Sequence, residues 1–241
     1  MSYWRSKAVP MNVKPILFNT EMTQAILEDR KDVTRRIAFP NKDLRPFPRA
    51  EYPNGWWFRG RAFVDWDSFI GSRYEYDPCK YQSGNLLWVR ETWCRWWMPH
   101  GEWHYCYKAS DPNGNKRPTG PEYDDRWETR PWSPSLHMPK EAARIFLRVT
   151  DVKLQRLNDM SEEDAMHEGF PDGREEVVSP LARFSILWDK TVKREDIDQY
   201  GWNANPWVWA IEFERVDKPG REWADYCGLE YADGGALAPA T

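Results

Sequence analysis

The amino-acid sequence predicts an α+β fold, a small mixed or antiparallel β-barrel with covering helices and two long irregular insertions. Three observations lead to this prediction: an apolar run followed by an amphipathic stretch near the start, two later stretches of alternating apolar and polar residues, and two stretches of helical spacing between them. Mostly antiparallel strands with a helix after the first strand are typical of a partly open barrel that carries helices on its surface.

The first half of the chain predicts two strands and a helix. Pro15–Phe18 is a short apolar run suited to a buried strand, and Leu86–Val89 is a second such run. Thr20–Arg30 predicts a helix, because Asn19 or Thr20 can cap it and apolar residues recur within it at helical spacing.

The second half predicts a long strand, two helices and a closing strand, at Arg144–Leu157, Met160–Phe170, Leu181–Lys190 and Pro206–Val216. Ser161 and Asp164 have the spacing of a capping box, and Gly169 supplies a helix stop. We expect a single domain over residues 1–216, with insertions at about 38–83 and 96–134. The polar residues 217–241 predict a disordered tail.

Composition limits the class of protein. Hydrophobic residues make up 41% and charged residues 30% of the chain, as in globular proteins, and no apolar run is long enough to cross a bilayer. We therefore expect a cytoplasmic protein without a membrane partner. The net charge of −4 argues against a protein that coats nucleic acid through bulk charge, but it leaves room for a local basic pocket.

The cysteines and histidines do not predict a metal site. Cys94, His100, His104 and Cys106 have the right atom types for zinc, but their spacing is not a standard tetrahedral ligand pattern. We expect no metal and no cofactor. Most of the sixteen tryptophans are expected in the core.

A short basic segment carries the strongest chemical signal. Lys31 and Thr34 lie three residues apart, and a lysine beside a hydroxyl can take its proton if burial lowers the pKa of the amine. Arg35 and Arg36 follow at once and offer guanidinium groups suited to phosphate. The alternative interpretation is a solvated basic loop after a helix.

Four segments together resemble an ASCH domain, which has a PUA-like barrel fold: ILEDRKDVTRR, GNLLWVRETW, MSEEDAMHEGF and WVWAIEFERV. The tryptophan-rich surroundings look most like ASCH-type proteins of bacteriophages and prophages, which would place the protein in the host cytoplasm. The chain is also similar to the bacterial N(4)-acetylcytidine amidohydrolases. That resemblance implies Lys31 as proton acceptor, Thr34 as nucleophile and Glu168 as proton donor. Asp32 follows Lys31 where those enzymes have threonine, and an adjacent acid should raise the pKa of Lys31.

Three functions remain open at this point. The first is a nucleoside or nucleic-acid pocket protein that hydrolyses N(4)-acylated cytidine or a related modified base. The second is a binding module without catalysis for RNA, DNA or a modified base, and the third is a ribonuclease-like activity. We expect RNA rather than DNA as the nucleic-acid partner; the oligomeric state is not predicted. The candidate binding residues are Arg30, Arg35, Arg36, Glu91 and Trp93.

Overall fold

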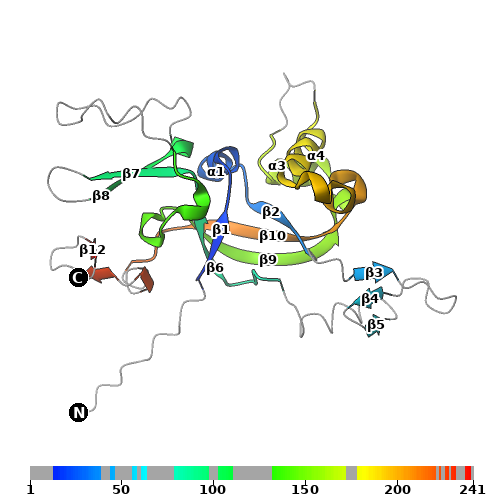
Figure 1. Ribbon diagram of the computed structural model, residues 1–241, viewed down its shortest axis with the longest axis horizontal. Helices are drawn as coiled ribbons and strands as arrows, with labels where there is room; N and C mark the ends of the chain where they lie inside the picture. The colour runs from blue at the N-terminus through cyan, green and yellow to red at the C-terminus, as the bar shows by residue number, and fades with distance from the viewer. Residues whose placement is uncertain are drawn as a thin grey trace, which may run out of the picture. The chain divides into compact units, whose positions relative to one another are not determined.

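The computed structural model describes residues 13–38, 79–97, 103–110, 132–171 and 178–220, three residues near the C-terminus (Trp223, Tyr226 and Cys227), and the backbone of five short strands (Figure 1). The strands are β1 (Val13–Leu17), β2 (Val33–Ile37), β3 (Leu44–Pro46), β4 (Trp56–Phe58), β5 (Arg61–Phe63), β6 (Leu86–Arg90), β7 (Trp93–Trp97), β8 (Trp103–Tyr107), β9 (Phe146–Arg156), β10 (Trp207–Val216), β11 (Leu229–Tyr231) and β12 (Leu237–Pro239). The α-helices are α1 (Thr20–Leu27), α3 (Glu162–His167), α4 (Pro180–Thr191) and α5 (Ile197–Tyr200). Short 3₁₀ helices are η1 (Lys108–Ser110), η3 (Ser135–His137), η4 (Lys140–Ala142), η5 (Leu157–Asp159), η6 (Arg194–Asp196) and η7 (Trp202–Ala204).

The chain forms two compact units where the sequence predicts one domain. The first unit comprises Met1–Asp29, Gly84–Val149 and Glu214–Thr241, and the second comprises Arg30–Ser83 and Thr150–Phe213. Both units are discontinuous in sequence, because the two longest strands each contribute residues to both.

The main strands are hydrogen-bonded in the order β1-β6-β9-β10-β2. In the first unit, β1 runs parallel to β6 with Val13 opposite Leu86, and β6 runs antiparallel to β9. In the second unit, β10 runs antiparallel to β2 with Ile211 opposite Thr34. The α+β class with a mixed sheet is therefore confirmed.

Local signals set the ends of the helices. The Asn19 side chain accepts a hydrogen bond from the Met22 N–H at the start of α1, as a capping residue does. Ser161 and Asp164 form the predicted capping box of α3. Gly169 has a φ of 100°, a conformation that glycine adopts without strain, and ends that helix. Among the described residues, no helix is long and apolar enough to cross a membrane.

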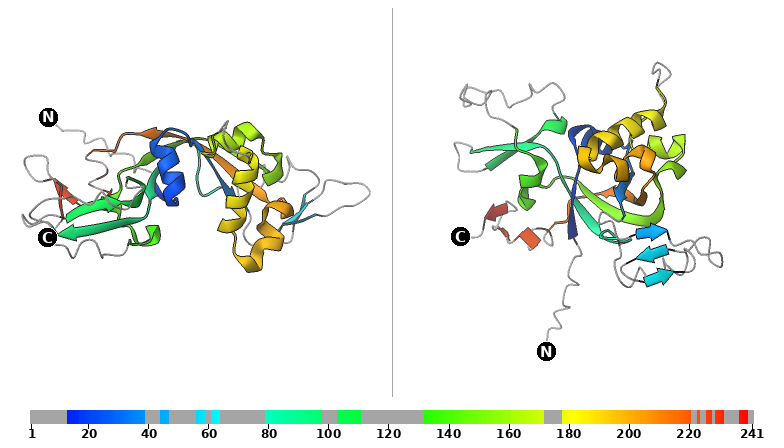
Figure 2. Two further views of the ribbon diagram at one scale, coloured as in Figure 1. Left: turned by 90° about the horizontal axis from the view of Figure 1, so that it is seen from above. Right: turned by 45° about the vertical axis from the view of Figure 1, so that its right-hand side comes forward.

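Helices α3 and α4 pack side by side in the second unit (Figure 2). Ser179 caps α4 and Pro180 occupies its first turn, a position where proline is favoured. Phe184 and Trp188 of α4 are buried against Ala165 of α3 in one apolar cluster. The predicted helix at Leu181–Lys190 is thus part of α4, and it buries the face that carries Phe184 and Trp188.

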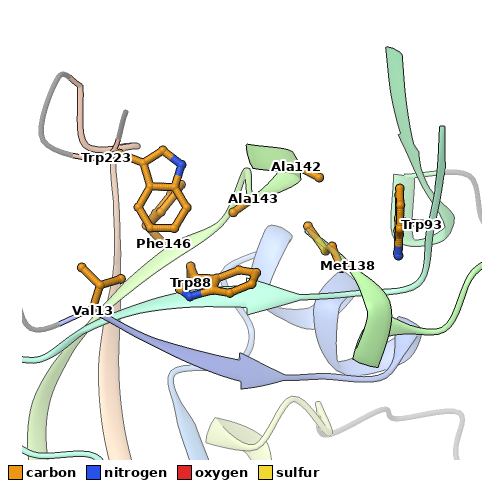
Figure 3. Packing of buried hydrophobic residues seen from close by; sticks show 8 residues of the cluster. All are labelled: Val13, Trp88, Trp93, Met138, Ala142, Ala143, Phe146 and Trp223. Atoms are coloured by element: carbon orange, nitrogen blue, oxygen red, sulfur yellow. The ribbon is translucent and has the colours of Figure 1, made fainter. Parts of the chain in front are cut away.

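The core of the first unit contains an aromatic residue from the predicted tail (Figure 3). Trp223 is 1% exposed, and its ring lies 4.8 Å from that of Phe146 and 6.0 Å from that of Trp88. Tyr226 stacks on it at 5.2 Å. Trp223, which lies in the segment predicted as a tail, is therefore a core residue of the first unit, because a large aromatic side chain buries much apolar surface.

The two predicted insertions contain regular structure where the structure describes them. β7 and β8 form an antiparallel hairpin in the first unit, and β3, β4 and β5 form a small antiparallel sheet. Both segments are rich in tryptophan and tyrosine, which favour strands. Within 38–83 and 96–134, residues 39–43, 47–55, 59–60, 64–78, 98–102 and 111–131 lie outside the described residues.

We expect Trp223→Ala to lower the free energy of unfolding by about 3–5 kcal/mol, the usual cost of truncating a buried aromatic side chain. Urea unfolding followed by circular dichroism would measure it. Leu136→Ala is the control, since Leu136 is 58% exposed and its truncation should cost about 0.5 kcal/mol or less. Equal losses in the two variants would contradict the assignment of Trp223 to the core.

Candidate functional site

The basic segment after α1 is a buried strand. β2 pairs with β10, and Lys31, Thr34 and Arg35 are 3%, 2% and 4% exposed. The interpretation of this segment as a solvated loop is therefore wrong. Its β-branched residues favour a strand, and its neighbour β10 is largely buried.

Backbone contacts bring this segment to the end of α3. Lys31 and Glu168 form an isolated antiparallel bridge, and the Asp32 N–H donates to the His167 carbonyl at 3.1 Å. The guanidinium of Arg30 donates to the Gly169 carbonyl at 2.8 Å. Glu168 is the capping residue of α3 and therefore has a fixed position beside Lys31.

Lys31, Arg35 and Glu168 form a buried charge network. The Lys31 ammonium donates to the Glu168 carboxylate and to the carbonyls of Val33 (2.7 Å) and Glu168 (3.2 Å). Arg35 donates to the Glu168 carboxylate at 3.2 Å and to Asp164 at 2.8 Å. The side chains of Lys31 and Glu168 are 0% and 2% exposed. One carboxylate therefore accepts from two cations out of contact with water.

Burial sets the direction of the Lys31 pKa. Removal from water lowers the pKa of Lys31, the adjacent Glu168 carboxylate opposes that change, and the positive charges of Arg36 and Arg35 add to the lowering. Asp32 has a different partner, because its carboxylate lies 2.8 Å from His167 Nδ1 in an exposed pair. The pKa of Lys31 is thus lowered, where the adjacent acid had led us to expect a rise.

Thr34 is buried but is not joined to this network. Side chains alternate across a strand, so Thr34 and Arg36 lie on one face of β2 and Arg35 lies on the other. Within the described residues, Thr34 has no hydrogen bond to Lys31 or Glu168. The structure therefore brings Lys31 and Glu168 into contact. Thr34, the third residue of the predicted catalytic set, is close to Lys31 in sequence but forms no described hydrogen bond with either residue.

The arginines differ from the predicted phosphate clamp. Arg35 is committed to two carboxylates, so its guanidinium is not presented to a ligand. Burial lowers the pKa of Arg36, while Tyr81 and Glu168 oppose that change. Asp164 was expected only as a capping residue. It precedes Glu168 by one helical turn, a spacing that puts both carboxylates on one face and would have suggested a shared cation.

Glu91 and Trp93 lie in the first unit and have structural partners there. Glu91 is 1% exposed, and Arg144 donates to both its oxygens at 2.8 Å. Burial raises the pKa of Glu91, and its bonds to Arg144 oppose that rise. Trp93 is 6% exposed and belongs to the apolar cluster of Figure 3. The surroundings of both are those of core residues.

The cysteine and histidine cluster is partly described. Cys94 and Cys106 are register partners on β7 and β8, and His104 lies on β8; His100 is outside the described residues. Over the part of the chain that the structure describes, no group of three metal-ligating side chains is arranged to hold a metal ion.

No protein-family model and no curated protein matches the chain. Among solved structures, the chain is similar to the crystal structure of protein EF3133 from Enterococcus faecalis V583, of family DUF984. The similarity covers 88% of this chain and 83% of that one, at 11% identity and a TM-score of 0.39. A similarity at this level does not indicate what the site does.

We expect Glu168→Gln to cost about 3–5 kcal/mol of unfolding free energy, because it leaves the Lys31 ammonium buried without a counter-charge. The double variant Lys31→Met, Glu168→Gln should recover part of that loss, which urea unfolding would measure as a coupling energy. The control is Lys153→Met, whose exposed pair with Glu212 should contribute less than about 1 kcal/mol. Additive losses at Lys31 and Glu168 would contradict the described network.

Proposed function

We propose that the chain is an ASCH-type protein with a PUA-like barrel that hydrolyses the amide of an N(4)-acylated cytidine or a related modified base. One observation carries the proposal. Lys31 and Glu168, 137 positions apart, meet in a buried contact. They are the two residues that the resemblance implies as proton acceptor and proton donor.

The buried pair has the properties of a proton relay. A lysine and a carboxylic acid in contact can share their protons in two ways, as ammonium with carboxylate or as neutral amine with neutral acid. Burial disfavours the charged arrangement, in keeping with the lowered pKa of Lys31. In the neutral arrangement Lys31 can accept a proton while Glu168 holds one to donate.

In the proposed reaction, Lys31 takes the proton of the Thr34 hydroxyl, and the Thr34 oxygen attacks the acyl carbonyl. The C–N bond breaks as Glu168 protonates the leaving nitrogen, which gives the free cytosine amine and an acyl ester on Thr34. Water then attacks the ester, the Glu168 carboxylate takes a proton from that water, and the Lys31 ammonium returns its proton to the Thr34 oxygen. The pair ends with the number of protons it had at the start. Thr34 enters this scheme through the resemblance, so it needs the most direct test.

One observation favours the binding module without catalysis as a second candidate. The Lys31 side chain is 0% exposed and makes three hydrogen bonds, as expected of a residue that ties β2 to α3. The ribonuclease-like alternative is less favoured, because it needs a phosphate clamp and Arg35 is occupied by Glu168 and Asp164.

We expect the purified chain to release acetate from N(4)-acetylcytidine, and we expect Lys31→Ala, Thr34→Ala and Glu168→Gln each to lower kcat/KM by about 10²–10⁴, the usual contribution of acid–base and nucleophilic groups. Chromatographic separation of cytidine from its acetylated form measures turnover.

Thr34→Ser is the matched control, since it keeps a hydroxyl and should retain activity. Circular dichroism must show each variant folded, because the network is also structural. No turnover by the wild-type chain on N(4)-acetylated or longer N(4)-acylated cytidines would overturn the proposal. Binding of those compounds without turnover would favour the second candidate.

The pH dependence follows from the Lys31 pKa. Catalysis needs Glu168 to hold a proton while the Lys31 amine is free, so the pair must hold one proton in total. We therefore expect kcat/KM to fall as pH rises through the higher apparent pKa of the Lys31–Glu168 pair, where that proton is lost. That pKa should lie below the ordinary lysine value of about 10.4, because burial lowers it. A pH–rate profile measured between pH 6 and 10 checks this. A rate that keeps rising up to pH 10 would contradict the shared proton of Lys31 and Glu168.

A further inference from the structure

A second candidate site lies in the first unit, whereas the residues proposed for hydrolysis belong to the second. It is a pocket of about 850 Å³. Its described walls come from the end of α1, from β6, from the start of β9, and from the end of β10 with the residues that follow. A volume of this size is typical of sites for small organic ligands.

The pocket is lined by more cations than anions. Its described lining contains Arg144, Arg148, Arg215 and Lys218, and Asp217 is the one carboxylate among them. A concave surface with such a surplus attracts anionic ligands, because its low-dielectric walls focus the field.

Two of the four cations are already engaged by carboxylates of this unit. Arg144 is bound through two hydrogen bonds by the buried Glu91. Arg215 lies 3.1 Å from Asp29 and also donates to the Leu27 carbonyl at 3.1 Å. These contacts fix the walls of the pocket and balance the charges of both arginines.

Arg148 and Lys218 remain available to a ligand. Arg148 lies 3.7 Å from Glu214, and both side chains are more than half exposed, so their attraction is weak in water. Among the described residues, no carboxylate forms an ion pair with Lys218. Removal from water lowers the pKa of Lys218, which is the expected direction for an ammonium without a close counter-charge. Arg148 and Lys218 each carry one positive charge, so together they match a ligand group with a charge near −2.

The remaining lining is apolar. Leu27, Leu86, Ile145 and Val216 also line this pocket, and all but Ile145 are partly exposed. A ligand that satisfies the whole surface therefore carries an anionic group at one end and an apolar or planar body at the other. An inorganic anion alone would leave this apolar surface in contact with water.

We propose that this pocket binds a phosphate monoester with a planar body, of the nucleoside monophosphate class. The phosphate lies between Arg148 and Lys218, where charge-assisted hydrogen bonds are strongest, and the body packs on Leu86 and Val216, which are both partly exposed. This site is independent of the proposed hydrolysis and requires neither Lys31 nor Glu168.

Isothermal titration calorimetry of the full chain with cytidine monophosphate, cytidine and inorganic phosphate tests the proposal. We expect cytidine monophosphate to bind and cytidine to bind at least about tenfold more weakly. The double variant Arg148→Gln, Lys218→Gln should weaken binding of the monophosphate by about tenfold or more, because charge-assisted hydrogen bonds are lost. Added salt should weaken binding of the monophosphate. A short RNA with a 5′-phosphate is the further probe. If it binds, the phosphate can come from a strand end, and if only the mononucleotide binds, the phosphate comes from a free nucleotide.

Lys193→Gln, Arg194→Gln together are the matched control, since both side chains are exposed and lie in the other unit. This double variant also removes one lysine and one arginine, and it should leave binding unchanged. Arg144 is not substituted, because its loss would leave Glu91 buried without a partner. Absence of binding for all phosphorylated probes would overturn the proposal, as would binding that is equal for cytidine and its monophosphate or unaffected by the double substitution.

Discussion

The burial of Glu168 against Lys31 and Arg35 is the constraint on which the second unit depends, because a charge taken from water must find its partner inside the protein. The network joins the start of β2 to the end of α3, and the backbone bridge between Lys31 and Glu168 fixes the same junction a second time. Any chemistry at this point is therefore performed by groups that also hold the fold.

The two units use buried carboxylates in different ways. Glu91 pairs with one arginine, Arg144, through two hydrogen bonds of 2.8 Å, and the opposite charges of the two side chains cancel. Glu168 accepts from two cations, and Asp164 takes part of the charge of Arg35. Because Arg36 adds a further positive charge to the surroundings of Lys31, its ammonium form is less favoured than that of a lysine in an isolated ion pair.

Periodicity predicted most helices and long strands, because β1, α1, β9, α4 and β10 each have a clear apolar pattern. β2 was missed, since four of the six residues from Lys31 to Arg36 are charged and the burial of three of the side chains depends on partners far away in sequence. Trp223 was missed because it stands alone in a polar stretch. The meeting of Lys31 with Glu168 came from resemblance, whereas the engagement of Arg35 by two carboxylates needed coordinates.

The discontinuity of the units has a consequence for biosynthesis. The second unit ends at Phe213, whereas the first needs its N-terminal strand, its central segment and Trp223 near the C-terminus. As the chain leaves the ribosome, β1 must wait for β6 more than seventy residues later, and the core of the first unit stays open until Trp223 has been added. A nascent chain therefore exposes apolar surface of the first unit for longest, and premature termination would harm that unit first.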